Sequence, residues 1–397
     1  MGAMRNLSQN AHEDSLEALN FLSRLTEKFT SVTFQPAEDR YGFYFPDSVI
    51  ASIVSEVTKN AKDAFDIHLS ADKIGLAPLN KHKLLIPEEK FTLEESCNLV
   101  IAAFEKFDLN LAMRAKKVIA NKERWILSHV KAGEAEGRCY LANSKVNPKP
   151  YAVIEYSYDG TINDAVYIAH ELGHLIADDY INEAGGTCED TKVNMAEVQG
   201  FFTQHILYDY LAGHPDVGIS RAGEKHFLGE ITRFLYAILV GVGELEAEKS
   251  MLEKKSNKEI ALSYSHALQS SLGDKWKEYG VANRVFHSLL NGQEGYAQGV
   301  YGLHTHPMAS LIAKGLFLYA KQIDRLPAEI FVGTLYGAGG SKDTVDVIME
   351  SGIENQQEWE RLVKRAVEQV IEPLTCRVEL DRNLESGIHH GSPMLKC

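Results

Sequence analysis

The five residues HELGH at positions 170–174 place two histidines and a glutamate inside a segment that is otherwise strongly apolar. Residues four apart in an α-helix lie one turn above each other, so His170 and His174 would face the same side, with Glu171 beside them. Apolar residues flank the motif at 166–169 and 175–177, which indicates a buried helix. Burying these polar side chains without partners would cost on the order of several kcal/mol. The segment therefore predicts a buried helix whose polar side chains share a bound ion.

Zinc suits this set of side chains. Two neutral imidazole nitrogens and a carboxylate form a common zinc ligand set and leave a fourth position open for water. In an HExxH helix the glutamate accepts the proton of the attacking water and later delivers it to the leaving amine. The bare pattern also occurs by chance, as two solvated or capped histidines, and the apolar flanks favour the metal. We therefore predict one zinc ion held by His170 and His174, with Glu171 as the catalytic base.

Glu197 is the candidate third ligand. It lies 23 residues after His174, in the first turn of the next expected helix at 195–211, and its immediate neighbours are apolar. A carboxylate in such surroundings is expected to be paired with a cation. The competing carboxylates lie in a polar loop, where solvated side chains are expected: Glu183, Glu189 and Asp190.

Composition and charge exclude several classes of protein. The chain has 55 acidic and 41 basic residues, a net charge of −14, which argues against nucleic acid or an anionic membrane as the main partner. The five cysteines are scattered without CxxC spacing, so neither a disulfide framework nor a structural zinc cluster is expected. No signal peptide is visible, and the most apolar stretch, 234–243, is about half a membrane span. We expect a cytoplasmic protein, with secretion by a non-classical route left open.

The spacing of apolar residues predicts a mainly α protein with one short β-sheet beside the HExxH helix. Helices are expected at 16–29, 49–65, 93–107, 109–126, 162–180, 195–211, 224–252, 258–272, 302–323 and 355–372. The expected organisation is an N-terminal helical region at 1–145, a catalytic region at 146–381 and a loose tail at 382–397.

One strand is expected directly before the HExxH helix. Residues 148–158 begin with two prolines and continue with β-branched and aromatic residues, which indicates a strand at the edge of its sheet. A turn at Asp159-Gly160 follows. Thr161 to Asp164 then fits a capping box with aspartate in place of glutamate at the start of the helix.

The stretch PYAVIEYSYDGTINDAVYIAHELGH at 150–174 resembles the oligopeptidase F and thimet oligopeptidase family of zinc metallopeptidases. That family shows a Pro-Tyr strand, an aromatic-rich Gly-Thr turn, an aspartate six residues before the first ligand, and HELGH. Here the turn is Gly160-Thr161 and the aspartate is Asp164. A second match lies at 196–204, where AEVQGFFTQ is similar to the family's helix that begins with the third-ligand glutamate. The resemblance therefore rests on two separate segments.

The resemblance implies a multi-helix, zincin-like metallopeptidase fold. It implies zinc held by His170, His174 and Glu197, with Glu171 as base. It also implies that the strand at 151–158 pairs with an extended peptide by β-augmentation. On that basis the expected substrate-binding residues of the strand are Tyr151, Val153 and Glu155.

A weaker match lies downstream, where the family has a histidine followed by tyrosines across a Gly-rich loop. His287 and Tyr296 fall nine residues apart in this register, and Tyr301 is a possible second tyrosine for substrate. A tyrosine hydroxyl or imidazole N–H near the metal can stabilise the oxyanion. The alternative is a core aromatic and a surface histidine. We interpret His304 and His306 as residues that start a helix or line the cleft.

The sequence departs from the family pattern at several positions. Gln204 stands where an acidic residue is usual, seven after the third ligand, and Gly200 replaces a small hydroxyl residue between them. Gly292 replaces a tyrosine of the Gly-rich loop. About 169 residues precede the motif, fewer than in full-length relatives, so a shallower cleft that admits larger substrates is expected.

The leading prediction is a zinc-dependent oligopeptidase or endopeptidase that acts on a peptide or protein substrate. A metallocarboxypeptidase remains an alternative, and it would need a base such as Arg221 or Arg284 to hold the terminal carboxylate. A protein-specific protease of the toxin or effector type is a second alternative. A non-catalytic peptide binder is a third, against which the intact Glu171 argues. The sequence does not indicate the oligomeric state.

Overall fold

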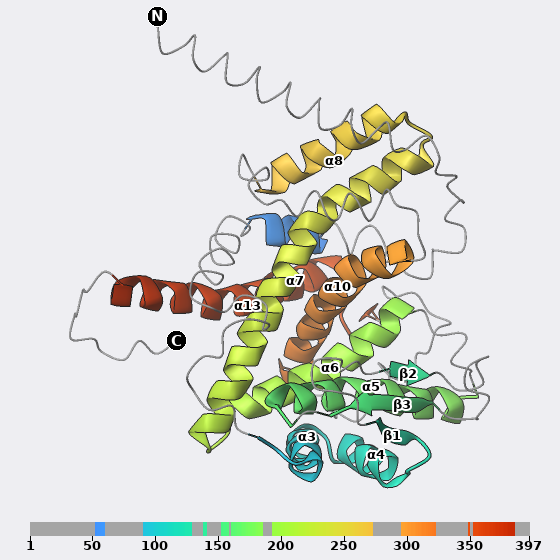
Figure 1. Ribbon diagram of the computed structural model, residues 1–397, viewed down its shortest axis with the longest axis vertical. Helices are drawn as coiled ribbons and strands as arrows, with labels where there is room; N and C mark the ends of the chain where they lie inside the picture. Colours follow the sequence, from blue (N-terminus) through green and yellow to red (C-terminus); the bar gives the residue numbers. More distant parts are fainter. Residues whose placement is uncertain are drawn as a thin grey trace, which may run out of the picture. The chain divides into compact units, whose positions relative to one another are not determined.

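The computed structural model describes residues 52–59, 90–128, 138–140, 152–158, 160–185, 193–272, 295–322, 348–349 and 352–385 (Figure 1). The helix expected at 16–29 and the candidate residues Tyr151 and His287 lie outside these residues. The backbone of Glu155, Tyr296 and Tyr301 is described, and their side chains are not.

The described part of the chain is mainly helical, which confirms the expected fold class at that level (Figure 1). The helices are α3 Leu93–Phe107, α4 Leu109–Ala120, α5 Ile162–Glu183, α6 Val193–Ala212, α7 Val217–Leu252, α8 Asn257–Leu272, α10 Gly295–Gln322 and α13 Gln356–Glu385. The strands are β1 Trp125–Ser128, β2 Arg138–Tyr140 and β3 Val153–Ser157. The largest differences from the expected bounds are that α7 and α10 begin earlier and that α13 continues through Pro373 to Glu385.

Local capping determines where the first helices begin and end. The Thr92 backbone N–H donates to the Glu95 carboxylate at 2.6 Å, which starts α3. Asp108 starts α4 by accepting the Leu111 N–H at 2.8 Å. Asn121 then has an extended backbone, and the chain enters β1. The expected helix at 109–126 was therefore wrong in its last residues, which form a turn and the start of a strand.

β3 is the central strand of a three-stranded sheet in the order β1-β3-β2. It pairs in parallel with β1, where Trp125 is opposite Ile154, and antiparallel with β2, where Cys139 is opposite the same residue. The prediction of an edge strand is therefore wrong. The prolines at 148 and 150 precede the first paired residue, Val153, so they remove no hydrogen bond from the ladder.

A buried arginine links the sheet to the HExxH helix. Arg124, at the start of β1, donates to Asp179 of α5 at 2.6 Å and to the Leu175 carbonyl at 3.2 Å. The backbone N–H of Ala152 donates to Asp178 at 3.0 Å. These contacts hold the second half of α5 against the sheet, while α3, α4 and α6 also pack on α5.

The chain divides into two compact units. One comprises residues 42–236 and 305–397 and contains α5 and α6; the other comprises 1–41 and 237–304 and contains α8. Within the second unit, Gly243 of α7 lies against Leu268 and Tyr264 of α8. Among the described residues, one segment, Val217–Gly243, is long and apolar enough to cross a membrane by length and composition. Because 62% of its best window is buried, as in the core helix of a soluble protein, this is weak evidence for a span.

Candidate metal centre

The turn before α5 fixes the start of the helix that carries the HExxH motif. Gly160 has a φ of +87°, which a glycine adopts without strain, and its carbonyl accepts the Phe91 N–H at 2.9 Å. Asp164 accepts the Thr161 backbone N–H at 2.6 Å and lies 3.3 Å from the Thr161 hydroxyl. Aspartate therefore serves at this position of the capping box, as the sequence predicts.

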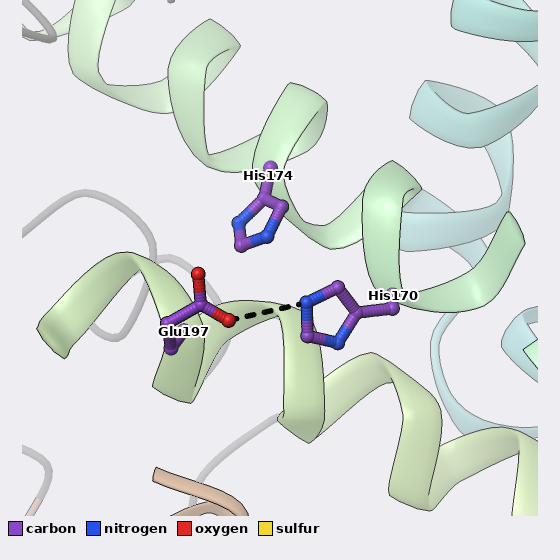
Figure 2. A group of neighbouring side chains, drawn as sticks. All are labelled: His170, His174 and Glu197. Atoms are coloured by element: carbon purple, nitrogen blue, oxygen red, sulfur yellow. Dashed lines mark ion pairs between the residues drawn. The ribbon is translucent and has the colours of Figure 1, made fainter. Parts of the chain in front are cut away.

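Three of the predicted side chains converge on one point. His170 and His174 extend from α5 toward Glu197 in the first turns of α6 (Figure 2). One ligand atom from each of the three residues lies within 4.8 Å of the others. The two imidazole rings lie edge to face with centroids 4.8 Å apart. The helical spacing places both histidines on one face, and α6 supplies the carboxylate opposite them.

Glu197 carries a buried oxygen that is surrounded by imidazoles. Its Oε2 lies 3.4 Å from His170 Nε2 and 3.3 Å from His306 Nε2. Neither contact has the geometry of a hydrogen bond, so this oxygen lacks a hydrogen-bond partner among the described residues. Burial raises the pKa of Glu197, but the contact with His170 and the nearby imidazoles outweigh it and lower the pKa to about 2. Glu197 is therefore ionised at neutral pH, and a bound cation would give its buried oxygen a partner.

The two histidines differ in their electrostatic surroundings. Burial lowers the pKa of His170, while the contact with Glu197 and the neighbouring carboxylates raise it by more, so that the net shift is upward. For His174, burial and the His170 charge lower the pKa to about 4. His174 is therefore neutral at pH 7, the form in which imidazole binds a metal.

Glu171 is buried beside these residues, and one of its two carboxylate oxygens lacks a donor. Its Oε2 has no hydrogen-bond partner among the described residues. Burial raises the pKa of Glu171 to about 7, and Glu197 adds to the rise while His170 opposes it. A carboxylate oxygen that has no hydrogen-bond partner, beside a cluster of candidate ligands, is placed to exchange a proton with a bound molecule.

Two glycines allow α5 and α6 to approach closely at this point. A Cβ atom on Gly173 would lie 2.5 Å from Thr203 Oγ1 and 2.9 Å from the Gln199 carbonyl. A Cβ atom on Gly200 would lie 2.7 Å from His170 Nε2. The glycine of HELGH, Gly173, is therefore required by helix packing, and Gly200 makes room for the His170 ring.

The side chains present fit a zinc ion. Two imidazoles and one carboxylate match its common ligand set, and the orphaned oxygen of Glu197 gains a partner when a cation binds. In a tetrahedral zinc site the ligand atoms lie roughly 3.3 Å apart, given bonds of about 2.0–2.1 Å. The 3.4 Å between His170 Nε2 and Glu197 Oε2 agrees with that spacing.

The other predicted site residues are not brought together by the described structure. Val153 is 5% exposed in the central strand, and Ile154 and Glu155 have strand partners on both sides. A peptide cannot add to β3 at these two residues while β1 and β2 are in place; the open edges of this sheet, within the described ranges, belong to β1 and β2. The catalytic roles of His287 and Tyr296, and that of Tyr301 in binding, stay predictions.

The structure adds polar residues that the sequence did not single out as site residues. His306 of α10 contacts Glu197, although its sequence position alone suggested only a helix start or the cleft wall. Gln204, Tyr208 and Glu230 form a buried polar group behind His170. A signal for two of them was present, because positions 197, 204 and 208 share one face of α6.

Comparison with solved structures gives several matches at low sequence identity, among them the following three. A protein of Chlamydophila abortus described as a peptidase matches with a TM-score of 0.63 at 15% identity, covering 86% of this chain and 57% of that one. One of Bacillus anthracis str. Ames described as an oligoendopeptidase F matches with a TM-score of 0.55 at 13% identity, covering 94% and 64%. The oligoendopeptidase-F of Enterococcus faecium matches with a TM-score of 0.52 at 12% identity, covering 92% and 59%.

The chain has an oligoendopeptidase F-like fold. No protein-family model matches the sequence, and no curated protein does. The likeness at these identities concerns the fold alone. The chain spans about three fifths of the length of the three oligoendopeptidase F-like structures, 57 to 64%.

Proposed function

We propose that this protein is a zinc-dependent peptidase, an oligopeptidase or endopeptidase that hydrolyses peptide bonds. The observation that carries the proposal is the convergence of His170, His174 and Glu197 beside Glu171, whose buried Oε2 has no hydrogen-bond partner among the described residues. The oligoendopeptidase F-like fold supports it, because its structural neighbours include proteins described as peptidases.

His170, His174 and Glu197 would hold the metal. When bound, zinc supplies a Lewis acid that polarises a carbonyl and lowers the pKa of water. The chain's own contribution is to fix the ligands on two rigid helices that Gly173 and Gly200 bring together.

Glu171 is the proposed base. Its carboxylate accepts a proton from the attacking water as the water oxygen bonds to the peptide carbonyl carbon. The same proton then passes to the amide nitrogen as the carbon–nitrogen bond breaks, which yields a carboxylic acid and an amine. At neutral pH the proton of the acid moves to the amine, so the final products are a carboxylate and an ammonium group. Atoms and charge balance with water as the only co-reactant.

Oxyanion stabilisation and peptide binding complete the proposal. His287 and Tyr296 are the proposed donors to the oxyanion. His306, whose side chain is 33% exposed beside Glu197, is proposed as a further donor. Peptides or proteins in a reducing, cytoplasmic setting are the proposed substrates.

The test uses the full chain and two matched variants of α5. Glu171→Gln removes the base, and Glu183→Gln makes the same change at an exposed position of the same helix. All three proteins, purified without chelator, are expected to hold one zinc per chain by mass spectrometry of metals. The Glu171→Gln variant should lose about 10²- to 10⁴-fold of the cleavage rate on a peptide library, whereas Glu183→Gln should keep it.

Several results would replace the proposal. Protein that holds no zinc and cannot be loaded with it is no zinc peptidase. Release of single C-terminal residues alone would identify a carboxypeptidase. Cleavage of intact proteins without cleavage of short peptides would identify a protein-specific protease. Zinc binding without any cleavage would identify a peptide binder.

A further inference from the structure

A chain of buried polar groups leads from His170 away from the ligand cluster. His170 Nδ1 lies 3.2 Å from Gln204 Oε1. The Gln204 amide nitrogen donates to the Glu230 carboxylate and lies 3.2 Å from the Tyr208 hydroxyl. Tyr208 in turn donates to Glu230 Oε2 at 2.9 Å. One branch of the chain thus ends on the Glu230 carboxylate of α7, a third helix. The Tyr208 hydroxyl also lies 2.8 Å from His226 Nδ1 of the same helix.

This arrangement fixes which atom of each group faces which. A carboxylate only accepts hydrogen bonds, so the amide atom of Gln204 that faces Glu230 must be nitrogen. The amide oxygen then faces His170, and because it also only accepts, His170 Nδ1 must carry the hydrogen. In the neutral ring, the form that binds a metal, the lone pair is then on Nε2, the atom that lies 3.4 Å from Glu197.

The polar chain is directed at the histidine and not at solvent. Gln204 is 3% exposed and Tyr208 is 7% exposed. Arg233 lies 4.0 Å from Glu230 and is 62% exposed, so this ion pair contributes little. Apolar side chains would pack α6 against α7 without the cost of burying a carboxylate. A role in packing alone therefore does not account for the choice of residues.

Histidines that bind metals commonly donate their second N–H to a carboxylate, which fixes the tautomer and makes the ligand more basic. In this chain Gln204 occupies the position next to His170, and the nearest carboxylate in the polar chain stands one residue further away. We propose that Glu230 is a positioning residue for the metal centre, acting on His170 through the Gln204 amide. The inference rests on the proposed function, since it assumes that His170 binds a metal.

Zinc affinity of the full chain, measured by competition with a chelator, tests the inference. Glu230→Gln should weaken zinc binding by about 10- to 100-fold, the range found when partners of metal ligands are removed. Glu224→Gln, a charge change at an exposed position of the same helix, should leave affinity unchanged. The free energy of unfolding without zinc, measured for each variant in urea, reports any general loss of structure.

A swap variant separates positioning from packing. Combining Gln204→Glu with Glu230→Gln moves the carboxylate next to His170 and lets the new amide donate to it. This double variant should regain most of the affinity that Glu230→Gln loses. Equal affinity in Glu230→Gln and wild type overturns the inference, as does a double variant that binds no better than the single one.

Two further outcomes are also decisive. If Glu230→Gln does not fold, Glu230→Asp takes its place, because it keeps the charge and shortens the reach to Gln204; affinity equal to wild type would then refute the role. If the wild-type chain binds no zinc, the proposed function fails and the inference falls with it. If the wild-type chain binds zinc and cleaves peptides while Glu230→Gln binds zinc weakly, the results support both the proposed function and the role of Glu230.

Discussion

The α6 backbone at Gly200 lies directly against the ring of His170. A Cβ atom there would be 2.7 Å from Nε2, 2.8 Å from Cε1 and 3.0 Å from Cδ2 of the imidazole. Real Cβ atoms do not approach so closely, so any larger residue at 200 must displace the ring. The imidazole of His170, with its candidate ligand atom Nε2, can therefore occupy this position only because residue 200 on the facing helix has no side chain.

Replacement of Gly200 by alanine should therefore weaken metal binding. We expect a loss of about tenfold or more in zinc affinity, or roughly 1.4 kcal/mol, measured by competition with a chelator. Gly229→Ala is the matched control, because a Cβ atom there meets nothing within 4 Å. That control should bind zinc normally and gain up to about 1 kcal/mol of stability from the better helix former. Unchanged zinc affinity in Gly200→Ala would contradict the close packing described for this ring.

Loss of Arg124 should destabilise the unit that holds the site. The arginine is 6% exposed and links β1 to Asp179 and to the Leu175 carbonyl. Arg124→Met leaves buried carboxylates without their cation, which typically costs about 3–5 kcal/mol. Unfolding in urea measures the change.

Arg361→Met is the matched surface control for that experiment. Arg361 is 68% exposed and contacts Glu358 at 3.4 Å, so its loss should change stability by less than about 1 kcal/mol. If the two variants are equally stable, the link between sheet and helix carries no stability.

Lys314 should make stability depend on alkaline pH. Burial, with a smaller effect of Lys321, lowers the pKa of Lys314 to about 8, while Asp209 opposes the shift. Its unfolded pKa is about 10.4. Below pH 8 Lys314 is charged in both the folded and the unfolded protein, and the folded protein bears the full free-energy cost of burying that charge. Between pH 8 and about 10.4 the unfolded protein binds more protons than the folded one, so the free energy of unfolding rises with pH.

The substitution Lys314→Met should remove that penalty. We expect it to raise the free energy of unfolding at pH 7 by roughly 1–3 kcal/mol and the gain to shrink toward zero near pH 10.4. Urea unfolding at both pH values checks this. Lys321→Met, which removes an exposed partner of Asp209, should show no such gain. A gain that grows with pH would have the wrong sign.

Cys97 should be unreactive in the folded protein. The side chain is 6% exposed, and burial raises the pKa of its thiol to about 11. At pH 8 the thiolate is then more than about a hundredfold rarer than for a free cysteine, whose pKa is about 8.5. Mass spectrometry of the peptide that contains Cys97, after iodoacetamide treatment, should show protection in buffer and full alkylation in urea. Rapid alkylation in buffer would contradict the buried position.

The ligand set was predictable because it depends on local geometry. His170 and His174 lie four apart on one helix, and the apolar neighbours of Glu197 indicated a buried carboxylate on the next helix. The structure brings these three residues together as that pattern predicts. The cap at Asp164 was also predictable, since Thr161 lies only three residues away.

The strands and the polar chain depend on contacts between distant residues. β1 and β2 have four and three residues, too few to show an alternating pattern. The first two residues of β1, Trp125 and Ile126, lie at the end of the helix expected at 109–126. The position of β3 follows from its partners, so the sequence of β3 alone did not exclude an edge. The pairing of Gln204 with Glu230 requires the packing of α7 against α6, which no spacing within either helix reveals.

The placement of the ligands along the chain also affects the order of assembly. All three ligand residues lie on α5 and α6, which follow each other directly, whereas the carboxylate of Glu230 arrives with α7. Contacts between neighbouring segments close with less loss of chain entropy than contacts between distant ones. We therefore expect the hairpin of α5 and α6 to bind a cation early in folding. The hydrogen bonds from Gln204 to Glu230, which fix the tautomer of His170, would form later, when α7 packs. Refolding in the presence of zinc would then begin from a loosely held ion and end with a tightly held one.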